Sequence, residues 1–169
     1  KKGMVAMKGS YHGKSFGALS LTFNPKYRKA FSPLVEKVSF ASFGDMDSLR
    51  SAIDEDTALI ILEPIQGESG IIVAPDGFLQ EVRNLCNEKG ILLIFDEIQA
   101  GLGRTGRLWA GEHWNTTPDI LCLAKGIAGG VPMGATLVRP DILAAISKGE
   151  HSSTFGGNPI SCAAGIAAL

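Results

Sequence analysis

Two residues of this sequence combine a reactive side chain with an unusual position. Lys125 follows the apolar run Ile120–Ala124 and opens a glycine-rich stretch. Asp96 follows a second apolar run, Ile91–Phe95. A lysine amine can bond to a carbonyl carbon as an imine, and a carboxylate can keep a pyridinium nitrogen protonated. The pair therefore predicts a site for pyridoxal phosphate (PLP). A single lysine after a strand is more often a solvated surface residue, so the prediction depends on its neighbours.

The elements that position these residues are indicated by apolar runs and helical spacing. Such runs are buried on both faces in a parallel sheet covered by helices, so we expect an α/β fold with a mainly parallel central sheet and helices on both faces. Glu63, Asp96 and Lys125 then lie at the carboxyl ends of strands, where these sheets bind ligands. The strands are predicted at Met4–Met7, Thr57–Leu62, Ile91–Phe95, Ile120–Leu123 and Ala135–Val138, and the helices at Phe78–Lys89, from Pro140 to near Gly149, and at Pro159–Leu169.

Composition limits the classes of function. The chain has 169 residues, of which 45% are hydrophobic, enough for the core of one domain. A net charge of −1 predicts no nucleic-acid partner. Three widely spaced cysteines indicate reduced thiols and a cytoplasmic protein. No apolar run reaches the roughly 18 residues of a membrane span, and we expect neither a membrane anchor nor a signal peptide. The three histidines are scattered, so no metal site is predicted.

Two further loops carry polar groups suited to ligands. The segment Glu63–Gly70 places two carboxylates and a glutamine after a strand, where they either bind a substrate cation or arginine or are simply solvated. The segment Ser152–Pro159 places hydroxyls and backbone amides before a helix, a setting that suits a phosphate. There, Asn158 and Pro159 also fit an ordinary helix N-terminus.

A rival interpretation from another enzyme class is a P-loop ATPase. Gly9–Ser15 resembles a phosphate-binding loop, and Ile91–Glu97 resembles the acidic strand that holds magnesium. However, a P-loop has four residues between its glycines before the Lys-Ser step, whereas Gly9 and Gly13 enclose three. Ser15–Phe23 is also a poor opening for a helix. The spacing therefore argues against this class.

Six short motifs, taken in order, resemble those of the class III (ω-amino-acid) aminotransferases of PLP fold type I. The resemblance covers the whole chain and implies that residues 1–169 are part of the PLP-binding large domain. An N-terminal segment and a C-terminal small domain would then lie outside this sequence. The motifs are Tyr11-His12-Gly13, Glu63–Glu68, Asp96–Gln99, Gly103–Gly106, Ala124-Lys125-Gly126 and Thr154–Pro159.

The resemblance implies roles for the residues around the cofactor ring. Lys125 bonds to PLP as an imine and then moves the proton of the substrate carbon. Asp96 pairs with the pyridinium nitrogen, and Gln99 lies near the phenolic oxygen of the ring. Glu97 and Ile98, within the same motif, are expected to contribute to the cofactor site.

Further roles implied by the resemblance concern the cofactor periphery and the substrate. Tyr11 stacks on the ring face, and Thr154 binds the cofactor phosphate from the partner subunit of a homodimer with shared active sites. Ser153 and Lys14 are expected to contact substrate. Glu68 resembles the glutamate that masks an arginine in one half-reaction and releases it for the 2-oxoacid in the other.

The branch of the family is indicated less directly than the family itself. Gly130–Gly134 and Gly149-Glu150-His151 resemble the acetylornithine aminotransferase branch, whose members act on N-acetylornithine or on carrier-linked ornithine or lysine. The expected reaction moves a terminal amino group from such a donor to 2-oxoglutarate. Lys14 stands where that branch usually has arginine, and lysine lacks the bidentate fork that grips a carboxylate. A putrescine- or 4-aminobutyrate-type aminotransferase therefore remains an alternative, as does an inactive paralogue.

Overall fold

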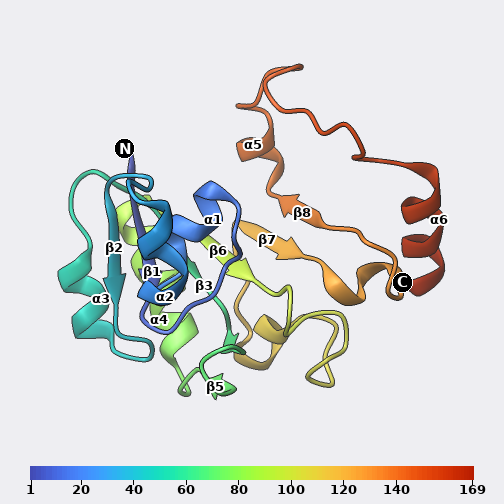
Figure 1. Cartoon of the computed structure of the whole chain (residues 1–169). Coiled ribbons are helices and arrows are strands. Elements are labelled where there is room, and N and C mark those ends of the chain that lie inside the picture. The colour runs from blue at the N-terminus through green and yellow to red at the C-terminus, as the bar shows by residue number, and fades with distance from the viewer.

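Six strands form one sheet in the order β2-β1-β3-β6-β7-β8 in a computed structural model that describes residues 1–169 (Figure 1). All neighbours are parallel except β8, which runs antiparallel to β7 at the sheet edge. The predicted α/β class with a mainly parallel sheet is confirmed. The strands are β1 (Gly3–Met7), β2 (Val38–Ala41), β3 (Thr57–Leu62), β6 (Leu92–Asp96), β7 (Ile120–Leu123) and β8 (Ala135–Val138).

Helix α4 (Phe78–Lys89) covers one face of the sheet. Its buried apolar side chains join the alternate residues of β1, β3 and β6 in one hydrophobic core. Gly90 ends α4 in the left-handed conformation that glycine adopts at little cost. On the opposite face, α1 (Phe16–Leu21) packs against β1 and buries Leu19. Helices therefore lie on both faces, as predicted.

Several predicted elements agree with the structure, and others do not. The bounds of β3, β7, β8 and α4 are those expected from the apolar runs. The helix expected from Pro140 to near Gly149 is wrong in length, because α5 is only Pro140–Leu143. The expectation that Ser15–Phe23 opens no helix is also wrong, since α1 forms there with buried packing. Tertiary contact outweighs weak local propensity in this short segment.

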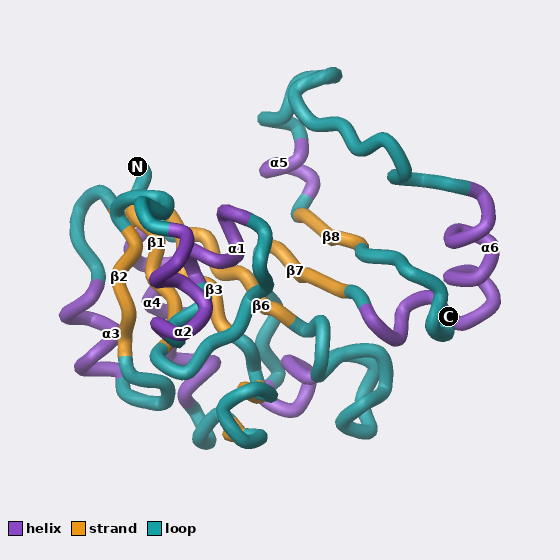
Figure 2. Tube along the Cα trace, in the orientation of Figure 1, coloured by secondary structure: helices purple, strands orange, loops and turns teal.

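The remaining elements surround the sheet (Figure 2). A hairpin of β4 (Ile65–Gln66) and β5 (Ile72–Val73) follows β3, and the short helix α2 (Pro25–Arg28) follows α1. Helix α3 (Met46–Ala52) packs against β2. Three 3-10 helices are present, at Lys29–Phe31, Ala110–Trp114 and Lys125–Ala128. None of the helices is both long and apolar enough to cross a membrane.

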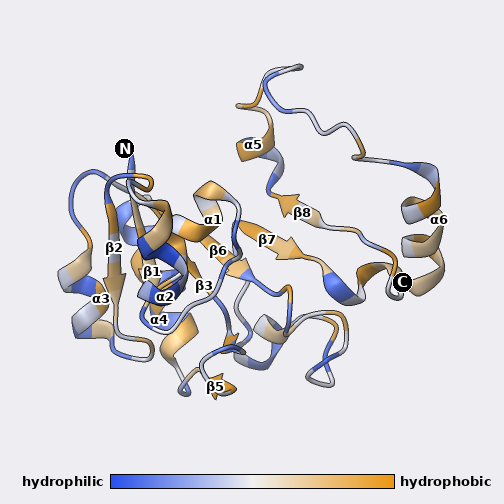
Figure 3. Ribbon diagram, in the orientation of Figure 1, coloured by the Kyte–Doolittle hydropathy of each residue, from blue (hydrophilic) through white to orange (hydrophobic).

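The C-terminal part of the chain projects from this body. The segment from α5 to α6 (Pro159–Ala168) runs apart from the sheet in Figure 1. Part of α6 is orange in Figure 3 because it carries hydrophobic residues, whereas the loop before it is mostly blue to white. Ile160 and Ile166 of α6 are 75% and 80% exposed, so this helix lacks the covering that apolar faces normally receive.

Candidate active site

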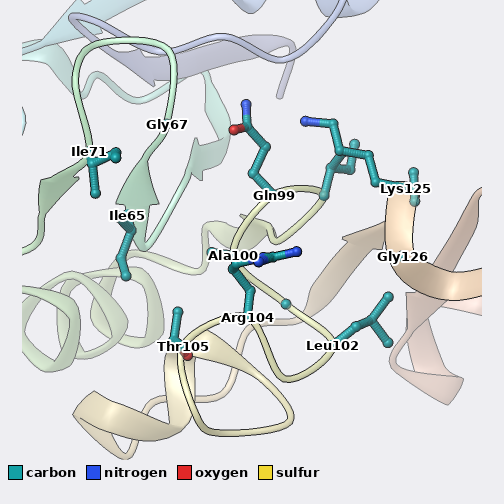
Figure 4. A pocket seen from close by; sticks show the side chains of 13 residues that line it. Ile65, Gly67, Ile71, Gln99, Ala100, Leu102, Arg104, Thr105, Lys125 and Gly126 are labelled. Carbon is teal, nitrogen blue, oxygen red and sulfur yellow. The ribbon is translucent and has the colours of Figure 1, made fainter. Parts of the chain in front are cut away.

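The carboxyl ends of the parallel strands surround a small cavity that contains both chemically notable residues. Its volume is about 90 Å³, and it adjoins a larger cavity of about 520 Å³. The two share Ile98, Gln99 and Lys125, and Figure 4 shows the larger one. The small cavity is lined by Tyr11, His12, Gly13, Glu63, Asp96, Ile98, Gln99 and Lys125. Four strand ends and the loops after them therefore converge on one place.

Lys125 occupies a strained backbone position. It begins the 3-10 helix after β7 with φ of +51°, in the left-handed region that non-glycine residues rarely adopt. Such conformations persist where the surrounding fold over-determines them, often at functional sites. The side chain is exposed and lines both cavities, and Figure 4 shows it extending into the larger one. The strand end thus delivers an accessible primary amine to the cavity.

Asp96 is buried and is oriented by two hydrogen bonds. Its Oδ2 lies 2.8 Å from His12 Nδ1, and its Oδ1 accepts a 3.1 Å bond from the Ile98 amide. An ionised carboxylate only accepts hydrogen bonds, so His12 Nδ1 carries the shared proton. The His12 and Asp96 side chains are 2% and 7% exposed. Each carboxylate oxygen keeps further acceptor capacity, which leaves Asp96 able to accept one more donor from the cavity.

Glu63 joins the loop of Tyr11, which lines the small cavity, to the loop of Gly67, which lines the larger one. Its Oε1 accepts a 2.9 Å bond from the Tyr11 amide, and its Oε2 accepts a 3.2 Å bond from the Gly67 amide. The residue is 4% exposed. Burial raises the pKa of its carboxyl, opposed by these two hydrogen bonds. Glu63 therefore ties the loop that carries Tyr11 to the hairpin after β3.

Gly67 and Gln99 lie in contact within the larger cavity. A Cβ at Gly67 would collide with the side-chain amide of Gln99. The absence of a side chain at Gly67 thus leaves room for Gln99 to lie against the hairpin. Gln99 lines both cavities beside Lys125, as its predicted role requires.

Glu97 lies outside the two cavities that contain Lys125. Its Oε2 and Oε1 accept bonds of 2.6 and 2.8 Å from the amides of Ala110 and Gly111. Burial raises the pKa of this carboxyl too. Glu97 is 1% exposed and lines neither cavity that contains Lys125. The geometry gives its carboxylate a part in holding the loop after β6 rather than a direct place in the cavity.

Two of the predicted substrate residues, Glu68 and Lys14, lie close to Tyr11 or to its neighbour Tyr27. Glu68 lines a third cavity of about 360 Å³ together with Tyr11 and Tyr27. The Lys14 ammonium lies 5.2 Å from the centre of the Tyr27 ring. Lys14 and Glu68 are thus near the small cavity without lining it.

Ser153 and Thr154 are not brought to Lys125 within one chain. Both are exposed, and neither lines any of the three cavities described above. They lie in the segment between α5 and α6, which Figure 1 shows away from the ends of β6 and β7. Their predicted contacts with cofactor and substrate are therefore not formed within this chain.

The sequence did not predict the contacts of three residues that the structure brings into or beside the site. His12 stands in the Tyr11–Gly13 motif, yet nothing in the sequence pairs it with a residue 84 positions away. Glu63 ends an apolar run, which gave its place but not its two amide partners. Tyr27 belongs to a short polar segment with no signal of its own.

Comparisons with known proteins agree with this geometry. The family profile "Aminotransferase class-III" matches residues 1–169. Acetylornithine aminotransferase of Methanopyrus kandleri is 52% identical over 165 residues, covering 98% of this chain and 42% of that protein. Ornithine aminotransferase 1 of Staphylococcus saprophyticus is 50% identical over 167 residues, with 98% and 42% covered.

Solved structures show the same relationship. The ornithine aminotransferase of Toxoplasma gondii matches with a TM-score of 0.94 at 38% identity, covering 98% of this chain and 40% of that one. A PLP-bound amine transaminase from an uncultivated Pseudomonas species matches with a TM-score of 0.90 at 31% identity, covering 98% and 44%. The chain spans about two fifths of the length of the curated relatives it matches. It belongs to the class III aminotransferase family.

Proposed function

We propose that the complete protein is a PLP-dependent aminotransferase that moves a terminal amino group from N-acetylornithine or a similar ω-amino acid to 2-oxoglutarate. The observation that carries this proposal is the small cavity in which the Lys125 amine and the Asp96 carboxylate both face the same space. The names of the relatives support the donor class. Family membership excludes the P-loop ATPase alternative.

The residues of the cavity fit this cofactor. Asp96 is held by His12 and by the Ile98 amide with acceptor capacity remaining, as a protonated ring nitrogen requires. Tyr11 and Ile98 both line the cavity and supply an aromatic and an aliphatic wall for a flat ring. Gln99 supplies a side-chain amide for a ring oxygen. We assign these residues, with Lys125, to cofactor binding, and Glu97 to support of the loop behind them.

When bound, PLP supplies a carbonyl that takes up an amino group and a ring that accepts electrons from the adjacent carbon. Lys125 supplies the amine that holds this carbonyl covalently. The same amine would move a proton at the reacting carbon of the donor as a general base. Asp96 would hold the ring nitrogen in its protonated form, and His12 keeps Asp96 oriented.

The substrate residues suggest a donor with a distant carboxylate. Lys14 offers a positive charge outside Tyr11, and Glu68 lines the cavity on that side. We propose that Lys14 binds the carboxylate of the donor and that Glu68 controls access of the 2-oxoacid. Since lysine lacks the fork of arginine, putrescine or 4-aminobutyrate is the alternative donor.

The quaternary proposal is a homodimer with shared active sites. Thr154 would reach the cofactor phosphate and Ser153 the substrate across the interface, because neither lines the cavities of its own chain. In this proposal residues 1–169 form part of the large domain, and segments outside this sequence complete it. We place the protein in the cytoplasm, in keeping with its three free cysteines.

The experiment that tests the function is performed on the complete enzyme. The wild type is expected to show the visible absorption of a lysine-bound PLP, and Lys125→Ala is expected to lose it on dialysis. Lys148→Ala, which alters an exposed lysine far along the chain, is the matched control and should keep it. Borohydride reduction should fix the cofactor on the peptide that contains Lys125. Absorption that persists in Lys125→Ala would overturn the proposal, and its absence from the wild type would favour an inactive paralogue.

A panel of N-acetylornithine, ornithine, putrescine and 4-aminobutyrate then tests the donor. The expected result is a preference for N-acetylornithine. A clear preference for putrescine would overturn the assignment of the donor while leaving the reaction type intact. Lys14→Arg in the same panel tests whether the side chain at position 14 binds the carboxylate of the donor.

A further inference from the structure

The Tyr27 ring contacts both Tyr11, the residue expected to stack on the cofactor ring, and the ammonium of Lys14. It lies in α2, whose first turn is set by Pro25 and by Asn24, whose side chain accepts a 3.0 Å bond from the Lys26 amide. The Tyr27 ring meets the Tyr11 ring edge-on, with centroids 5.5 Å apart and an interplanar angle of 74°. This is a favoured geometry for two aromatic rings. A short helix is thus placed so that one aromatic side chain braces Tyr11.

The same ring holds Lys14. The Lys14 ammonium lies 5.2 Å from the Tyr27 centroid, within the range of a cation–π interaction. Lys14 forms no salt bridge with any acidic residue of this chain. The face of Tyr27 is therefore the contact that the structure gives to this ammonium. Because a ring face consumes none of the ammonium donors, they remain available to an anion.

The cavity that Tyr11 and Tyr27 line has the size of a substrate site. It has a volume of about 360 Å³, and Tyr11, Tyr27 and Glu68 contribute to its lining. Tyr27 stands between Tyr11, which faces the small cavity with Lys125, and Lys14. A donor whose far end lay on this side of Tyr11 would bring its carboxylate toward Lys14.

We propose that Tyr27 is a specificity-determining positioning residue, which holds the Lys14 ammonium where it binds a carboxylate distant from the reacting amine of the donor. This inference rests on the proposed aminotransferase function. It concerns how the ω-amino-acid donor of that proposal is recognised, since the carboxylate and the reacting amine of such a donor lie at opposite ends. It also explains how a flexible lysine can read a carboxylate without the fork of arginine, since the ring limits the positions of the ammonium.

The test compares two donors that differ only in the carboxylate, N-acetylornithine and N-acetylputrescine. The complete holoenzyme is mixed with each donor, and the spectral change of the cofactor gives the rate and apparent affinity of the half-reaction. Tyr27→Leu removes the ring face, whereas Tyr27→Phe keeps it. A cation–π contact at an exposed site is worth about two- to fivefold in binding. Tyr27→Leu should therefore lower the preference for N-acetylornithine by about that factor, through apparent affinity, and Tyr27→Phe should retain the preference.

Lys14→Met makes the test specific to the pair. If Tyr27 acts through Lys14, Tyr27→Leu should have no further effect on the donor preference in the Lys14→Met background. Equal losses with both donors would show that Tyr27 is only structural and would overturn the proposal. An undiminished effect of Tyr27→Leu in the Lys14→Met background would overturn it as well.

Two controls separate other causes of failure. If Tyr27→Leu does not retain cofactor, Tyr27→Met supplies similar bulk without a ring face, and the same comparison applies. If the wild type shows no lysine-bound cofactor, the proposed function itself fails. A wild type that transaminates both donors with equal affinity would contradict the role of Lys14 and Tyr27 alone.

Discussion

Replacement of Glu63 offers a demanding test of how the site is built. This carboxylate accepts hydrogen bonds from the amides of Tyr11 and Gly67, which belong to different loops. Glutamine has nearly the same shape but only one acceptor oxygen, so one amide loses its partner. Alanine leaves both amides without one. The two substitutions therefore remove different numbers of bonds at one buried position.

The structure sets the size of the two effects. A buried donor left without an acceptor costs about 1–3 kcal/mol. Glu63→Gln is therefore expected to lower the free energy of unfolding by about 1–3 kcal/mol, and Glu63→Ala by about 2–6 kcal/mol. Because the Tyr11 amide is one of the partners, both variants should also bind the cofactor more weakly. Glu88→Gln, at an exposed position of α4, is the control and should change stability by less than about 0.5 kcal/mol.

The pH dependence of the free energy of unfolding provides a second, independent test of Glu63. Burial raises the pKa of Glu63 in the folded state above its ordinary value of 4.5. The folded protein then takes up this proton before the unfolded chain does as pH falls. The contribution of Glu63 to stability is therefore largest below 4.5 and is lost as pH rises through the folded pKa. The glutamine variant lacks this titration, so its penalty should be larger at about pH 5 than at about pH 7.

Urea unfolding of the complete holoenzyme at fixed protein and cofactor concentration measures these differences, together with the cofactor dissociation constant. Equal losses in Glu63→Gln and Glu63→Ala would refute the two-amide account. A penalty that does not change with pH would refute the effect of burial on its pKa.

Four further predictions concern packing, helix propensity, thiol reactivity and the buried hydrogen bond between His12 and Asp96. Gly111→Ala places a Cβ within 2.9 Å of a buried aromatic ring and of a backbone carbonyl, which should destabilise the protein by about 1–3 kcal/mol in thermal unfolding. Gly17→Ala, in an open part of α1, should stabilise it by about 0.5–1 kcal/mol. Burial raises the pKa of Cys86 to about 12 and that of Cys122 to about 11, so mass spectrometry should detect alkylation of either at about pH 8 only after unfolding. His12→Phe removes a hydrogen bond to the buried Asp96 carboxylate and should weaken cofactor binding by roughly 10- to 100-fold. An unchanged cofactor dissociation constant in equilibrium dialysis would contradict the role of His12 in orienting Asp96.

Local sequence was sufficient for the elements whose pattern is strong. Ala58–Leu62 and Ile120–Ala124 are uninterrupted apolar runs. The strands predicted there, Thr57–Leu62 and Ile120–Leu123, form with those bounds. The helix Phe78–Lys89 shows apolar residues at helical spacing and a glycine after it. By contrast, β2 (Val38–Ala41) is a run of four residues that contains Ser39, lies at a sheet edge with only Ala41 buried, and was not predicted. Patterns predict elements best where burial acts on every residue of a strand or on one full helix face.

The sequence by itself determined which chemistry was available and at which end of the sheet it would lie. Lys125 and Asp96 could be placed at strand ends because parallel strands present their carboxyl ends at one edge. Only the tertiary structure decided that His12 orients Asp96, that Glu63 joins two loops and that Tyr27 lies between Tyr11 and Lys14. These contacts join segments that are far apart in the chain or set by loop geometry. Their formation depends on strand order and packing, which no local pattern records.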